Sequence, residues 1–139
     1  MYIGTYYHTL EEQGRVSLPK SFRETNNKWI VTRGLDGGLF IFPEDSFQEK
    51  LQKISENHVF TKKAHRDFVR LMTNEAQAIE VDQNGRVNLP DYLIQFAHLN
   101  KDLAVVGSLD YIEVWERDLY HQYIDQLEDS AEEIAEKVV

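Results

Sequence analysis

The sequence predicts an α+β fold in which a strand-rich unit occurs twice and helices lie at the periphery. The first observation is the stretch Gly14-Arg15-Val16-Ser17-Leu18-Pro19, which returns as Gly85-Arg86-Val87-Asn88-Leu89-Pro90 with five of six positions identical. The second is that later landmarks match in the same order, Gly34-Leu35-Asp36 with Ser108-Leu109-Asp110 and residues 39–42 with 112–115. A fixed order of matched positions indicates an internal duplication.

Each copy predicts two short strands around a glycine turn. Gln13-Gly14 and Asn84-Gly85 are hairpin signals, because glycine adopts positive φ readily and Asn-Gly suits a type I′ turn. After each glycine, apolar and polar residues alternate, so one face of the short strand is apolar. Pro19 and Pro90 end these strands, and each is expected to begin a short helix that lies on the apolar face. The apolar strand positions are Val16, Leu18, Val87 and Leu89.

The other elements follow from periodicity. The spacing of Phe47, Leu51 and Ile54 predicts a helix, and Thr61 is expected to cap a second one. One long helix is expected to start near Arg117 and to run to the C-terminal end of the sequence. Runs of β-forming residues predict strands over 2–10, 29–32, 39–42, 77–82, 87–89, 103–106 and 111–115.

These elements divide the chain into four segments. The two repeats occupy residues 5–47 and 76–119, connecting helices occupy 48–75, and the C-terminal helix occupies 120–139. The strands of one unit leave an apolar face open. We therefore expect the two copies to pair about a pseudo-two-fold axis and to close a single barrel.

Charge is unevenly distributed along the chain. The 139 residues carry a formal net charge of −9, which by itself disfavours binding to nucleic acid. Residues 1–75, however, hold 11 basic and 10 acidic residues, whereas residues 76–139 hold 4 and 14. Exposed charges are screened over about 8 Å at physiological salt. A locally basic surface on the first half can therefore meet phosphate while the acidic half faces elsewhere.

The residues give no support to several other classes of function. No apolar run reaches the roughly 18 residues of a spanning helix, no signal-peptide pattern is present, and the lack of cysteine leaves no disulfide or thiolate zinc site. No catalytic constellation or phosphate loop stands out, and the histidines lack metal-binding spacing. We expect a cytoplasmic protein that is not an enzyme and holds no cofactor or metal. The histidines are His8, His58, His65, His98 and His121.

Arg15 and Arg86 are the candidate functional residues, since each follows a turn glycine and begins a strand from which its side chain can project. An arginine fork can bind O6 and N7 of guanine in the major groove of DNA. A structural ion pair is the alternative, between Glu11 and Arg15 and between Asp82 and Arg86. For Arg86 the two interpretations weigh equally.

For Arg15 the DNA role is favoured, because its surroundings are expected also to hold the basic residues Lys20 and Arg23, which follow it in the sequence. Together with Arg33, these two are expected to contact phosphates, which position a protein on DNA without specifying sequence. The expected turn and structural residues are Glu11, Gly14, Pro19, Asp82, Gly85 and Pro90.

The sequence resembles the MraZ family of bacterial regulators, which are built from two SpoVT/AbrB-type units. The family signature Asp-x-x-x-Arg occurs as Asp82 and Arg86, whereas the first copy has Glu11 before Arg15. Glutamate keeps the charge but adds a methylene, so a tight contact of that carboxylate with its own turn is not expected to carry over from the family signature. The resemblance spans essentially the whole chain, and besides the repeated Gly-Arg-Val stretch it is carried by Tyr2-Ile3-Gly4-Thr5, His8-Thr9-Leu10 and Thr32-Arg33-Gly34-Leu35-Asp36.

This resemblance implies a duplicated AbrB-like swapped-hairpin β-barrel, in which one chain does what two interlaced chains do in AbrB-like proteins. It also implies a ring-shaped homo-oligomer that binds double-stranded DNA at the nucleoid. The expected sites are promoter direct repeats upstream of the cell-division and cell-wall gene cluster, the protein's own gene included. The alternative from another class is a ring-shaped scaffold that docks protein partners on its acidic C-terminal helix. No membrane partner is expected.

Overall fold

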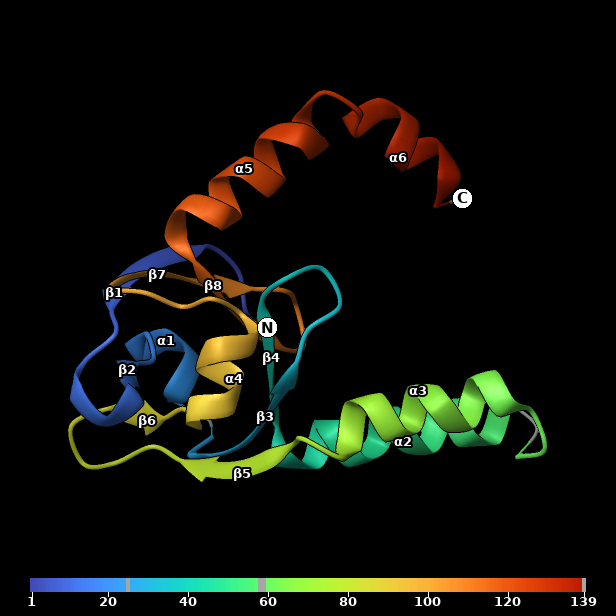
Figure 1. Ribbon diagram of the computed structural model, residues 1–139, viewed down its shortest axis with the longest axis horizontal. Helices are drawn as coiled ribbons and strands as arrows, with labels where there is room; N and C mark the ends of the chain where they lie inside the picture. Colours follow the sequence, from blue (N-terminus) through green and yellow to red (C-terminus); the bar gives the residue numbers. More distant parts are fainter. Residues whose placement is uncertain (25, 58–59, 139) are drawn as a thin grey trace.

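The computed structural model describes residues 1–24, 26–57 and 60–138 (Figure 1). Its strands are β1 (Thr5–Thr9), β2 (Arg15–Ser17), β3 (Lys28–Arg33), β4 (Leu39–Pro43), β5 (Gln77–Glu80), β6 (Arg86–Asn88), β7 (Asp102–Gly107) and β8 (Ile112–Glu116). Its helices are α1 (Lys20–Arg23), α2 (Glu44–Asn57), α3 (Lys63–Thr73), α4 (Asp91–Phe96), α5 (Arg117–Glu128) and α6 (Ala131–Lys137), and a 3₁₀ turn spans Glu12–Gly14. The strands form a six-stranded antiparallel sheet in the order β1-β7-β8-β4-β3-β5 and a separate ribbon of β2 and β6.

Strand pairing crosses repeatedly between the two halves of the chain. β1 pairs with β7, β3 with β5, β4 with β8 and β2 with β6, in addition to the local pairs β3–β4 and β7–β8. The registers of corresponding pairs agree, since Thr9 lies opposite Asp102 just as its repeat equivalent Glu80 lies opposite Lys28. The two repeats therefore share one sheet.

The hairpins predicted at Gln13-Gly14 and Asn84-Gly85 are wrong as strand pairings. Both turns form, with the N–H of Gly14 donating to the carbonyl of Glu11 at 3.2 Å and that of Gly85 to Asp82 at 3.0 Å. The strands that flank each turn nevertheless pair with the other repeat. The five residues of β1 find a partner over their full length in β7, whereas β2 offers only three residues.

The main core lies between the sheet and the ribbon. Val16 and Val87 face each other across the ribbon with 0% and 1% of their surface exposed. Phe22 of α1 and Leu93 of α4 belong to the same buried cluster. Burying one such side chain contributes about 1.5–3 kcal/mol, so this cluster binds the two repeats together. The sheet adds Trp29, Val31, Leu39, Ile41, Leu103, Val105, Ile112 and Val114.

Helices cover parts of the outer face of the sheet. Phe40 and Phe42 of β4 form a second cluster with α2 and α3. Trp115 of β8 packs against Tyr120 and Tyr123 of α5, with ring centroids 5.7 and 5.2 Å apart. The α2–α3 pair and the α5–α6 segment leave the sheet in different directions (Figure 1), and both are therefore peripheral, as the sequence predicts.

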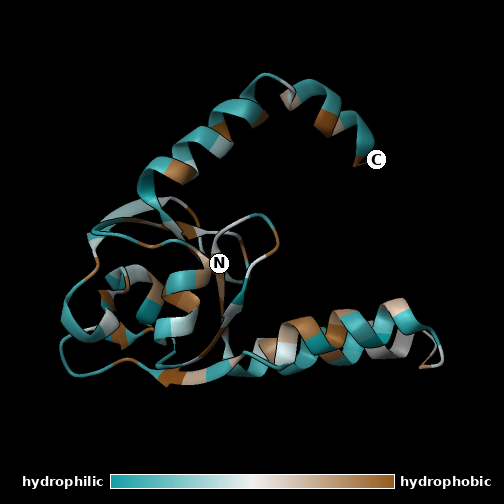
Figure 2. Ribbon diagram, in the orientation of Figure 1, coloured by the Kyte–Doolittle hydropathy of each residue, from teal (hydrophilic) through white to brown (hydrophobic). Residues whose placement is uncertain are grey.

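The C-terminal segment is two helices rather than the one long helix predicted. α5 ends at Glu128 and α6 begins at Ala131, because the chain bends at Ser130, whose φ is −120°. Aspartate and serine favour helix ends over helix interiors, and the pair Asp129-Ser130 overrides the continuous apolar spacing. Every residue of α6 is exposed, and the segment is mostly hydrophilic with isolated apolar positions (Figure 2).

The helix cap predicted at Thr61 is also wrong, since α3 begins at Lys63 after Lys62.

Candidate nucleic-acid interface

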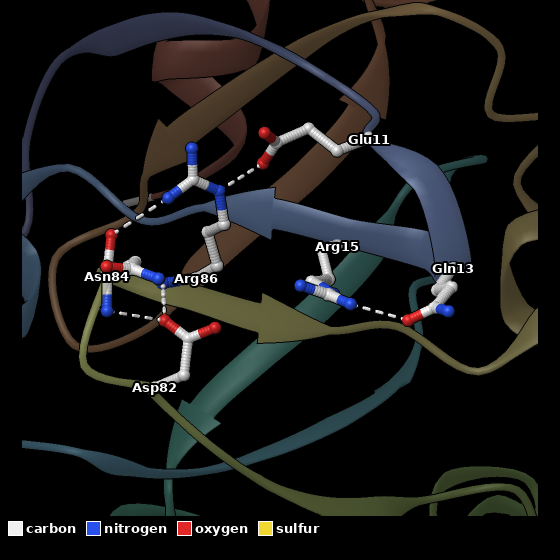
Figure 3. A network of polar contacts seen from close by, with 6 residues as sticks. All are labelled: Glu11, Gln13, Arg15, Asp82, Asn84 and Arg86. Carbon is white, nitrogen blue, oxygen red and sulfur yellow. Dashed lines mark hydrogen bonds and ion pairs between the residues drawn. The ribbon is translucent and has the colours of Figure 1, made fainter.

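The two-stranded ribbon turns one face to the core and the other to solvent. Val16 and Val87 are buried, so their neighbours along each strand point outward, because successive strand residues alternate between faces. The register places Arg15 opposite Asn88 and Ser17 opposite Arg86. The two arginines lie at opposite ends of the ribbon (Figure 3). We call these four outward residues the ribbon face: Arg15, Ser17, Arg86 and Asn88.

The turn of the second repeat, residues 82–85, is organised by Asp82. Its Oδ1 accepts hydrogen bonds from the backbone N–H groups of Asn84 at 2.8 Å and Arg86 at 3.0 Å. An aspartate side chain is short enough to reach the backbone just ahead of it. These two bonds, that of Arg86 first, hold the pKa of Asp82 below its ordinary value of 3.8. Asp82 therefore acts as a turn residue, in its ionised form.

The first turn lacks this arrangement. The carboxylate of Glu11 accepts no hydrogen bond from the backbone of its own turn among the described contacts, because the extra methylene carries it past those groups. Gln13 takes a φ of +63°, which is unfavourable for a residue with a side chain. Asn84, its repeat equivalent, is not among the described residues with positive φ. The type I′ turn predicted at Asn84-Gly85 is therefore wrong.

Glu11 reaches instead across to the other repeat. The Nε of Arg86 donates to Oε2 of Glu11, and its Nη1 donates to the backbone carbonyl of Asn84 at 3.2 Å (Figure 3). The hydrogen bond from Arg86 lowers the pKa of Glu11. The predicted ion pair of Asp82 with Arg86 is wrong, because Asp82 bonds the backbone of Arg86 and Glu11 takes its side chain.

Arg15 has much greater freedom. Its side chain is exposed, and Nη2 donates to Oε1 of Gln13. The predicted ion pair with Glu11 is wrong, since Glu11 faces Arg86. Within the described part of the chain the Arg15 side chain makes no other hydrogen bond or ion pair, although its charge acts on the carboxylates of Glu11 and Asp82 from a distance. Arg15 therefore keeps guanidinium donors for a ligand, while Arg86 is held in place.

Lys20 and Arg23 lie beside the second turn, so the prediction that they surround Arg15 is wrong. The strand β2 leads away from the first turn, and the N–H of Leu18 donates to the carbonyl of Gly85 at 3.1 Å. The guanidinium of Arg23 packs on Gly85 so closely that a Cβ there would collide with it. Both basic residues line a surface depression with residues 82–85. Their charge therefore stands at the Arg86 end of the ribbon.

Arg33 lies apart from the other predicted DNA contacts. Its guanidinium carbon is 4.6 Å from the ring centroid of Phe96 in α4, and its buried Nε has no hydrogen-bond partner among the described residues. It lines a pocket with residues of α3, among them Asp67 and Arg70, and with the following Asn74 and Glu75. None of these neighbours of Arg33 belongs to the ribbon face that carries Arg15. The role of Arg33 in binding phosphate stays a prediction.

Sequence reasoning missed Asn88 and Ser17 as members of the ribbon face. Their signal was available, because they stand two residues from Arg86 and Arg15 on strands whose alternation was recognised. No group of three or more metal-ligating side chains is found in the described residues, and no described helix has the length and apolar character needed to cross a membrane. His58 lies outside the described residues.

The lowered pKa of the two turn carboxylates leads us to expect that the folded state loses stability in acid. Both Glu11 and Asp82 have a pKa below the ordinary 4.5 and 3.8, so their ionised forms stabilise the folded state. This stabilisation is complete above the ordinary pKa values and is lost as pH falls through them towards the depressed ones. We expect Asp82→Asn, which keeps an acceptor oxygen but cannot titrate, to flatten the fall of the melting temperature below about pH 4.5.

The control is Asp91→Asn, an exposed residue at the start of α4. Thermal denaturation followed by circular dichroism across an acid pH series measures both variants. An acid profile of Asp82→Asn that matches wild type would show that this carboxylate does not hold the turn through its charge. Asp82→Ala, which removes the acceptor as well, should melt lower than Asp82→Asn at neutral pH.

The fold and the ribbon face define the class: a two-repeat α+β protein whose halves share one sheet and present a polar ribbon to solvent. The family model described as "MraZ protein, putative antitoxin-like" matches residues 1–71 and again residues 72–139. The chain therefore belongs to the MraZ family, and the resemblance drawn from the motifs is confirmed. Membership supports a regulatory role in general.

Proposed function

We propose that this protein is a sequence-specific DNA-binding transcriptional regulator that acts at direct repeats upstream of the cell-division and cell-wall gene cluster, its own gene included. On this proposal it works at the nucleoid in the cytoplasm and has no enzymatic activity. Its fold is then an AbrB-like swapped-hairpin barrel duplicated within one chain, with a pseudo-two-fold axis between Val16 and Val87. The exchange of strands between repeats and their corresponding registers support this assignment.

The observation that carries the proposal is the ribbon face with its uncommitted arginine. The major groove of DNA is about 12 Å wide and admits a two-stranded β-ribbon. Arg15 is exposed and bonded only to Gln13 among its described neighbours, so its fork can turn to a guanine edge. Lys20 and Arg23 flank the other end of the ribbon, where they can meet the phosphates beside the groove.

We further propose that several copies act together in a ring-shaped homo-oligomer. The exposed C-terminal segment supports this, since Ile134 and Val138 of that segment are 38% and 79% exposed. Linked copies make later DNA contacts intramolecular, which raises avidity without new contacts. Light scattering at micromolar concentration should give a mass above that of a dimer, and a monomeric mass would contradict this part of the proposal.

Gel retardation with the upstream region of the protein's own gene tests the function directly. We expect binding that weakens steeply with salt, because each neutralised phosphate releases counterions and lowers the logarithmic salt slope by about 0.9. A duplex of the same length from an unrelated coding region is the control. A binding constant that stays the same between low and physiological salt would be incompatible with phosphate contact by Lys20 and Arg23.

A protein-docking scaffold is the second candidate, and the α5–α6 segment is the observation that favours it. The segment is exposed along α6 and leads away from the sheet (Figure 1). Its charge is mostly negative, as docking of a basic partner would require. Absence of retardation at any salt concentration, with the fold intact, would favour this candidate. The acidic residues of the segment are Asp118, Asp125, Glu128, Asp129, Glu132, Glu133 and Glu136.

A further inference from the structure

The two ends of the ribbon face are not chemically equal. One end pairs Arg15 with Asn88 and the other pairs Arg86 with Ser17. These are corresponding positions of the two repeats, so an arginine recurs while asparagine is replaced by serine. The two ends of the ribbon are therefore equivalent sites that differ in the residue opposite the arginine, and their base preferences can be compared within one protein.

Asn88 is available for an external partner. Its side chain is exposed, and its amide makes no hydrogen bond within the described part of the chain. The side chain stays close to the first turn, since a Cβ built on Gly14 would be 3.4 Å from its Oδ1. Asn88 is thus located beside the residue that holds spare guanidinium donors, Arg15.

The side chains at the opposite end of the ribbon are less available to a ligand. Arg86 is held by Glu11 and by the carbonyl of Asn84, and Ser17 is partly buried. A serine hydroxyl can donate or accept, so it discriminates poorly between bases. Base reading is therefore favoured at the Arg15–Asn88 end.

The dimensions of this pair match neighbouring base pairs. Side chains directly opposite each other in an antiparallel pair have Cβ atoms about 4.5–5.5 Å apart, and successive bases of a strand are spaced by about 3.4 Å. Two such side chains can therefore reach adjacent steps of one groove. Arginine pairs bidentately with guanine, and asparagine pairs bidentately with N6 and N7 of adenine.

We propose that Asn88 is a specificity-determining residue that reads an adenine beside the guanine read by Arg15. This inference rests on the proposed DNA-binding function and deepens it. Arg15 supplies affinity and reads guanine. Asn88 adds discrimination at the neighbouring base pair, and the Arg86–Ser17 end adds none of comparable strength.

The experiment starts from duplexes with a randomised centre, from which the wild-type protein selects its site. The affinity of wild type, Asn88→Ala and Ser17→Ala is then measured for every single base-pair change in that site, at one salt concentration. We expect Asn88→Ala to bind the selected site about tenfold more weakly, the effect of roughly 1.4 kcal/mol. It should lose the preference at one A·T pair only, while Ser17→Ala keeps the wild-type pattern.

A second variant tests the chemistry of the contact. Asn88→Asp can only accept hydrogen bonds, and carboxylates accept from N4 of cytosine, so the preference at that pair should shift from adenine towards cytosine. Unchanged melting temperatures establish that each variant is folded. Retention of every base preference by Asn88→Ala, or loss of the same preference in Ser17→Ala, overturns the inference. Failure of wild type to select any site overturns the proposed function and the inference with it.

Discussion

Arg15→Ala is expected to abolish retardation of the upstream DNA while leaving the melting temperature nearly unchanged. Loss of a bidentate arginine contact costs about 1–3 kcal/mol of binding, and an oligomer loses it once per copy. The fold should not suffer, because Arg15 is exposed and bonded only to Gln13 among the described residues. Substitutions of this kind usually change stability by less than about 0.5 kcal/mol.

Lys62→Ala is the matched control, since it removes the same charge from an exposed residue just before α3, outside both the ribbon and the C-terminal segment. It should bind DNA like wild type. Arg86→Ala gives the complementary result, because it leaves Glu11 without its partner. It should lower the melting temperature and weaken DNA binding less than Arg15→Ala. If Arg86→Ala loses binding with its fold intact while Arg15→Ala binds normally, the roles of the two arginines are reversed.

Separating the two repeats should have the largest effect on stability. We expect neither residues 1–74 nor residues 75–139, a division that leaves α3 whole, to be a folded monomer. Each half would lose four strand pairings and expose core residues such as Trp29 and Ile112, both fully buried in the intact chain. Five such side chains represent about 8–15 kcal/mol, which matches the roughly 5–15 kcal/mol of stability of a whole domain.

Circular dichroism and the fluorescence of Trp29 and Trp115 measure this outcome, because both indoles are buried in the intact chain. Mixing the halves should restore the native spectrum, and the intact chain should unfold in one transition. A half that melts cooperatively as a monomer would show that the repeats are independent. A half that folds only as a dimer would agree with exchange of strands between copies.

Much of this fold could be predicted from the sequence, because the relevant forces are local. The alternation around Val16 and Val87 identified the strands and their buried face, and the difference between Asp82 and Glu11 pointed to unequal turns. One added methylene decides whether a carboxylate reaches its own backbone, and this can be predicted from the residue type alone. The break at Ser130 was missed because the apolar spacing continues through it.

The candidate site was harder to predict, since its partners come from different repeats. The contact between Arg86 and Glu11 joins residues far apart in the sequence, and no local pattern indicates it. The same applies to Arg23, which was assigned to Arg15 by nearness in sequence but packs on Gly85. Only the pairing of β2 with β6 brings these groups together, and pairing between distant strands is not encoded in local periodicity.

The pairing of β1 with β7 has a consequence during synthesis on the ribosome. Strand β1 is made well before its partner, because that partner spans Asp102–Gly107 and lies beyond five intervening strands in the chain. Contacts at such long sequence separation slow folding, because loop closure must precede their formation. The nascent chain must therefore leave β1, with Tyr6 and Tyr7, without its strand partner until β7 has been made. This long interval is when capture by chaperones, or pairing with a neighbouring nascent copy, competes with correct folding.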